Sequence, residues 1–238
     1  MNENLHRTKP GGTVRPPTVP QWRRVLLGAE SRWPAFAAVL VIIVGQARLA
    51  NSLQLRPVWL LPGLAAVLLI VSIGFYIAPG EPGKLERAIS IGLASVLVIA
   101  NAGSLVMLVR GVFFGSILRP MDLLADGVVL WVVNVLVFAI VFWELDGGGP
   151  EERLDHRRDH PDLVFPQQQA DQEHLTNPDW QPSFGDYLFV ALTNGTAFSP
   201  TDTMPYTKRA KLAMGVQSIL SFAIAAVLVA RAVNTARG

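Results

Sequence analysis

Five long runs of apolar residues dominate the chain, and most ionisable side chains lie between them. The runs cover residues 33–50, 58–78, 88–109, 122–143 and 212–233. A helix rises about 1.5 Å per residue, so about 20 apolar residues cross the roughly 30 Å hydrocarbon core of a bilayer. Backbone groups cannot stay unpaired in lipid, and no run alternates polar and apolar residues as barrel strands do. The pattern predicts an all-α polytopic bundle with five transmembrane helices.

The first run is the shortest of the five and carries Gln46 and Arg48 near its end. It follows 32 residues that include Pro16, Pro17 and Pro20. A secretory signal peptide has a short basic leader and a small-residue cleavage site. Since neither feature is present here, we expect this run to be a retained span.

A sixth apolar run, within residues 183–200, contains only about a dozen apolar residues, too few to cross a bilayer. Ser183 is suited to be the N-cap of a helix, and Asp186 would lie at the positive end of its dipole. We therefore expect one re-entrant half-helix in addition to the five spans.

The polar segments divide the chain into four regions. Residues 1–32 carry six Lys or Arg against two Glu, and we expect a disordered basic tail, in which residues 22–28 form at most a short surface helix. Residues 33–144 form a four-helix transmembrane region. Residues 145–182 hold nine acids against three arginines, with several prolines, and we expect an irregular acidic loop. Residues 183–238 contain the half-helix, a polar strip and the last span.

Composition narrows the class of function. The chain is 51% apolar and 16% charged, whereas a soluble domain carries about 25% charged residues, so a soluble enzyme is excluded. It has no cysteine, which excludes disulfides and thiolate metal sites. No phosphate loop and no Gly-x-Ser-x-Gly element is present. The basic N-terminus lacks interleaved aromatic residues except Trp22 and Trp33. We expect no enzymatic activity, no cofactor and no nucleic-acid partner, with the lipid bilayer as the surroundings.

A metal site is the one chemistry that the acidic loop suggests. His156 and His160 are four residues apart, a spacing that on a helix can direct two imidazoles toward one metal ion. However, Pro161 opposes a stable helix, and the two intervening arginines repel a cation. We expect a solvated charged loop that binds no metal.

Polar residues inside the apolar runs are costly in lipid and are candidates for function. The uncharged ones are Asn101, Ser104, Asn134, Gln217, Ser218 and Ser221. We interpret them as interhelical hydrogen-bonding residues rather than as a permeation pathway. Asp122 and Asp126 should lie near the interface, Asp126 being the acid that enters the bilayer, and Glu144 should be interfacial.

The C-terminal quarter resembles the pore region of the potassium-channel superfamily, in which a half-helix, a polar strip and a long inner helix follow one another. Asp202 and Pro205 match the aspartate after the filter and the proline three residues later, and Thr196 matches a threonine before the filter. It is also similar to uncharacterised bacterial multi-pass membrane proteins with a potassium-channel-like pore-loop C-terminus lacking the glycine filter. Ser199 and Thr201 replace the two filter glycines.

The missing glycines determine what the resemblance implies. A potassium filter turns every carbonyl toward the ion, which glycine permits and which Pro200 opposes. The resemblance thus implies a channel-like, homo-oligomeric pore-loop protein without a potassium-selective filter, conducting a monovalent ion. The pore-lining candidates are Thr193, Asn194, Thr196, Ser199, Thr201 and Asp202. The alternative is a non-conducting membrane scaffold, or structural membrane protein, whose polar strip packs between helices.

Positive charge predicts the orientation. With a cytoplasmic N-terminus and five crossings, fourteen of the 20 Lys and Arg residues are inside; if the half-helix crosses fully, thirteen are. We therefore expect a multi-pass protein of the bacterial inner membrane with its N-terminus in the cytoplasm. A potassium channel has its pore loop outside and its C-terminus inside, and five crossings give the reverse.

Overall fold

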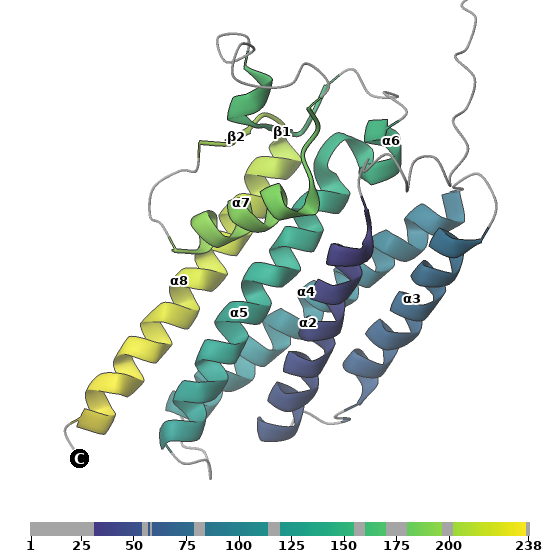
Figure 1. Cartoon of the computed structure of the whole chain (residues 1–238). Helices are drawn as coiled ribbons and strands as arrows, with labels where there is room; N and C mark the ends of the chain where they lie inside the picture. Colours follow the sequence, from purple (N-terminus) through teal and green to yellow (C-terminus); the bar gives the residue numbers. More distant parts are fainter. Residues whose placement is uncertain are drawn as a thin grey trace, which may run out of the picture.

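The five expected spans are long, parallel or antiparallel helices in the computed structural model (Figure 1), which describes residues 31–53, 57, 59–78, 84–113, 120–154, 160–169, 180–196 and 202–236. They are α2 (Trp33–Ser52), α3 (Leu60–Ile77), α4 (Lys84–Phe113), α5 (Pro120–Leu145) and α8 (Lys208–Ala236). Each is long and apolar enough to cross a membrane. With the short helix α7 (Phe184–Thr196), they confirm the all-α bundle of five spans and one half-helix.

Four of the five long helices extend beyond the apolar runs that predicted them, whereas α3 lies within its run. Helix α4 begins at Lys84 and α8 begins at Lys208, each four residues before its apolar run. Helical hydrogen bonding does not stop where the lipid stops, so charged residues continue a helix into the interfacial region. Helix α2 begins at Trp33, where its apolar run begins, and Pro34 in its first turn has no N–H that would need an acceptor.

The segment between α5 and α8 contains short elements where the sequence predicted an irregular loop. They are η1 (Asp146–Gly148), α6 (Pro150–Leu154), β1 (Leu163–Val164), η2 (Pro166–Gln168) and β2 (Met204–Pro205). Strands β1 and β2 pair antiparallel, with Leu163 opposite Pro205. The basic tail up to residue 30, with its proposed surface helix, and the loop residues 155–159 and 170–179 lie outside the described residues.

Helix α5 occupies the centre of the bundle, where it contacts α2, α4, α7 and α8, while α3 packs at the edge on α2 and α4. The two ends of the bundle differ. We call the end that carries the start of α2, the end of α5 and the β1–β2 pair the α7 end, and the opposite end the far end (Figure 1). Helices α2, α4 and α8 run from the α7 end to the far end, and α3 and α5 run back.

Two apolar clusters fill the bundle. The larger one extends to the α7 end and includes Phe138, Phe142 and Trp143 of α5 with Tyr187 of α7. The smaller one, which we call the far-end leucine cluster, consists of Leu49, Leu105, Leu108, Leu123, Leu130, Ile224 and Val227. Large apolar side chains also face outward, among them Val44, Ile70 and Ile219, each about 70% exposed, as a lipid-facing surface requires.

Candidate functional site

Helix α7 enters the bundle from the α7 end, and the chain returns to the same end after it. Its 13 residues span about 20 Å, less than the hydrocarbon core. The chain before it forms β1 and the chain after it forms β2, and these strands pair. The N–H of Tyr206 also donates to the carbonyl oxygen of Asp162, at 2.8 Å. Both flanks of α7 therefore lie together, which makes α7 a re-entrant helix.

The start of α7 is fixed by its own first turn. The backbone N–H and the hydroxyl of Ser183 both donate to the Asp186 carboxylate, at 2.7 and 2.8 Å. This side chain reaches back from the third helical position to the residue before the helix, as in a capping box. The carboxylate also lies at the positive end of the helix dipole. The predicted helix start is confirmed.

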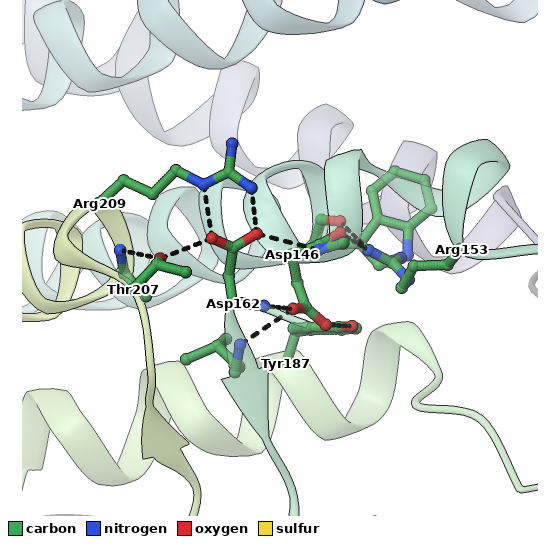
Figure 2. Close-up of polar contacts among 10 residues, drawn as sticks. Asp146, Arg153, Asp162, Tyr187, Thr207 and Arg209 are labelled. Carbon is green, nitrogen blue, oxygen red and sulfur yellow. Dashed lines mark hydrogen bonds and ion pairs between the residues drawn. The ribbon is translucent and has the colours of Figure 1, made fainter. Parts of the chain in front are cut away.

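A buried carboxylate, Asp146, connects α5 to α7 and to the segment before β1 (Figure 2). It is the first residue after α5 and is 1% exposed. One carboxylate oxygen accepts the N–H groups of Asp162 and Leu163, at 2.7 and 3.0 Å. The other accepts the hydroxyl proton of Tyr187, at 2.6 Å. Hydrogen bonds to a charged acceptor are strong, so Asp146 holds the first turn of α7 against the end of α5.

A second buried carboxylate, Asp162, connects the same segment to the start of α8. Arg209 donates to both of its oxygens through Nε and Nη2, and the Thr207 hydroxyl donates at 2.5 Å. Burial of Asp162 by itself raises its pKa, but the hydrogen bonds from Arg209 and Thr207 and the Arg209 charge lower the pKa further than burial raises it. The pKa of Asp162 therefore lies below its ordinary value, and the carboxylate stays ionised at neutral pH.

Three glycines let the chain turn back after α5. The Asp146 carboxylate then accepts the N–H of Asp162, and the Asp162 carboxylate accepts the N–H of Gly147. Gly147, Gly148 and Gly149 have φ of 57°, 90° and 98°, conformations that side chains with a Cβ rarely adopt. After this turn Arg153 donates to the carbonyl oxygens of Trp143 and Asp146, at 2.8 and 2.6 Å. The cation thus compensates the negative end of the α5 dipole.

The other end of α7 is held deep in the bundle by amide side chains. Asn194 donates to the Met214 carbonyl oxygen at 3.0 Å and to the Gln217 side chain at 2.8 Å, and it accepts from the Ser218 hydroxyl at 3.2 Å. Gln217, fully buried, donates to the Ala191 carbonyl oxygen at 2.6 Å. Gln217 lies nine residues into α8, about 14 Å along its axis. The last turn of α7 therefore reaches well below the α7 end.

The polar contacts continue from this turn across the bundle. The Asn134 side chain on α5 donates to Ser221 of α8 at 2.9 Å and accepts from Asn101 of α4 at 2.7 Å. The Ser104 hydroxyl of α4 donates to Gln46 of α2 at 2.9 Å. All six polar residues expected to form interhelical hydrogen bonds do so, which confirms that interpretation.

Of the predicted pore-lining residues, the structure describes Thr193, Asn194, Thr196 and Asp202; residues 199 and 201 lie outside the described part. The hydroxyls of Thr193 and Thr196 both donate to carbonyl oxygens of their own helix, at 2.8 Å in each case. Asn194 is bound to α8, as described above. Asp202 is exposed, at the α7 end next to β2.

One charged position, Arg32, differs from the sequence interpretation. Arg32, assigned to the disordered tail, is buried and forms an ion pair with Glu86 of α4 at 2.9 Å. Its guanidinium also lies over the rings of Tyr76 and Trp143. Among the described residues no group of His, Asp or Glu side chains is arranged to hold a metal ion; His160 is exposed.

Sequence reasoning did not find the buried pair Asp146 and Asp162, because both were counted among the acids of a solvated loop. The available signal was the position of Asp146, which directly follows an apolar span and precedes three glycines. The partners Tyr187, Thr207 and Arg209 carried no such signal, since ordinary surface residues have the same types.

The fold and the half-helix therefore rest on the chain's own geometry. Comparison with known proteins finds no matching family model, no matching curated protein and no matching solved structure.

Proposed function

We propose that this integral membrane protein is a channel-like pore-loop protein that works as a homo-oligomer and lacks a potassium-selective filter. The observation that carries the proposal is the position of α7. The chain segments before and after it pair at the α7 end, and its last turn reaches the level of Gln217 inside the bundle. Irregular backbone at membrane depth is tolerated where it is buried in protein or lines a water-filled cavity. We expect the strip after Thr196 to meet that condition in an assembly.

Charge favours a monovalent cation as the permeant species. The C-terminal end of α7 carries the negative part of its dipole, and Asp202 is an exposed acid at the α7 end, next to β2. One half-helix cannot enclose a pore, so several copies must bring their strips together. Selectivity is expected to be weak, since serine and threonine replace the filter glycines.

The test is cation flux into liposomes that contain the purified full chain. We expect flux of a monovalent cation, and we expect Asp202→Ala to lower its rate or change its selectivity. Asp122→Ala is the matched control, because Asp122 is an exposed acid at the far end and should leave flux unchanged. Absence of flux from correctly inserted wild-type protein would refute the channel proposal.

The second candidate is a non-conducting membrane scaffold. The observation in its favour is that Thr193, Asn194 and Thr196 use their polar groups within the subunit. If the protein is a scaffold, wild type and Asp202→Ala both show no cation flux in the same assay.

We further propose that the protein lies in the bacterial inner membrane with its N-terminus, and hence the α7 end, in the cytoplasm. The chain has no native cysteine, so single cysteines can report the side of each end. His160 and Asp122 are exposed at opposite ends. We expect His160→Cys to react from the cytoplasmic side and Asp122→Cys from the other side. The reverse result refutes the orientation.

A further inference from the structure

Three buried aspartates lie in the described part of the chain, and one of them differs from the other two. The carboxylates of Asp146 and Asp162 each accept at least three hydrogen bonds from fixed donors. Asp126, in the second turn of α5 and 1% exposed, accepts one, from the Ser52 hydroxyl to Oδ2. Its Oδ1 is buried and accepts no hydrogen bond from any described residue.

The charge of Asp126 is only loosely balanced. Arg48 of α2 is its ion-pair partner, with Nη2 at 3.6 Å from Oδ1, and the Arg48 side chain is 55% exposed. The other charged side chains described at this end, Arg110 and Asp122, are both exposed. The described α8 residues that pack here, Val227 and Leu228, are apolar. A buried carboxylate in a membrane bundle is costly unless it is well paired.

The surroundings of Asp126 separate it from the polar contacts in the middle of the bundle. Leu130, one turn further along α5, belongs to the far-end leucine cluster, together with Leu49 and Leu105. Along α2, Leu49 lies between Gln46, which accepts from Ser104, and Ser52, which donates to Asp126. Asp126 is about 9 Å along α5 from its start at Pro120. Any exchange of protons between Asp126 and water is therefore expected at the far end of the bundle.

We propose that Asp126 is a proton-binding site that exchanges with this aqueous phase. A hydronium ion transfers its proton to Oδ1, where an O–H bond forms, and a water molecule is left. The carboxylate becomes a neutral acid that keeps the hydrogen bond from Ser52 and no longer attracts Arg48. A metal cation is a poorer ligand for this site, because the Arg48 guanidinium lies beside the same oxygen. This proposal does not depend on conduction through α7.

The test is infrared spectroscopy of the full chain in liposomes over a range of pH. A protonated carboxylic acid has a C=O stretch that a carboxylate lacks. All 18 Asp and Glu side chains gain such a band when they are protonated, so the signal is the difference between spectra. On acidification we expect one band that wild type and Asp122→Asn share and that Asp126→Asn lacks. The pair is matched, because the two acids are one turn apart on α5 and differ in burial.

A second variant keeps the proposal testable if Asp126→Asn does not fold. Ser52→Ala retains the carboxylate and removes its hydroxyl donor, so the frequency of the C=O band should differ from that of wild type. The proposal is overturned if the band of Ser52→Ala has the wild-type frequency, or if Asp126→Asn and wild type give the same spectra. It is also overturned if the band responds to Na⁺ at fixed pH and not to pH.

Discussion

Removing one hydroxyl at the α7 end measures how firmly the re-entrant helix is anchored. Tyr187 is fully buried, and its hydroxyl donates to the Asp146 carboxylate at 2.6 Å. The change Tyr187→Phe deletes this donor and keeps the ring, including its contact with the Arg153 guanidinium, which lies 5.1 Å from the ring centre. The perturbation thus removes the charge-assisted hydrogen bond to Asp146.

The magnitude follows from the type of bond. A hydrogen bond to a charged group contributes about 1.5–3 kcal/mol, and its loss leaves a buried acceptor less satisfied. Asp146 keeps the N–H donors of Asp162 and Leu163, so the carboxylate is not left bare. We therefore expect the free energy of unfolding to fall by about 2 kcal/mol, within that range.

Equilibrium unfolding in mixed micelles, followed by the fluorescence of the tryptophans, measures this difference. The matched control is Tyr206→Phe, because the Tyr206 side chain is 71% exposed, and we expect less than about 0.5 kcal/mol of change. If Tyr187→Phe and Tyr206→Phe have the same free energy of unfolding, the anchoring argument is wrong.

Three further predictions test other parts of the structure by the same unfolding measurement. Asn134→Leu removes two interhelical hydrogen bonds and should cost about 1–2 kcal/mol; no loss would mean that these bonds are replaced. Gly195→Ala should destabilise, because its methyl group would lie 3.2 Å from a hydroxyl of α8, whereas Gly103→Ala, in open space, should be neutral or stabilising. Arg209→Gln should destabilise at neutral pH. Since the pKa of Asp162 is lowered in the folded state, the difference from wild type should shrink as pH falls below about 3.8, and a pH-independent difference contradicts this.

Local sequence was sufficient to predict the helices, because each helix forms the hydrogen bonds of its own backbone N–H and C=O groups. An apolar run of about 20 residues has one low-energy structure in lipid, whatever its neighbours are. The same reasoning applies to α7, since a dozen apolar residues with Ser183 and Asp186 at the start define a helix too short to cross. The interpretation of Asn134 and Gln217 as interhelical hydrogen-bonding residues was confirmed for a similar reason, as buried amides need partners.

Tertiary structure alone decided which groups become partners. Asp126 lies in α5 and Asp146 directly follows it. The sequence does not show that the Asp146 carboxylate has three hydrogen-bond donors and the Asp126 carboxylate has one. The number of donors depends on which loop folds back over the helix end and on how the neighbouring helices are rotated. Those arrangements arise from contacts between residues far apart in the chain, such as Asp162 with Arg209, so the apolar pattern determined the spans and packing between them determined the chemistry.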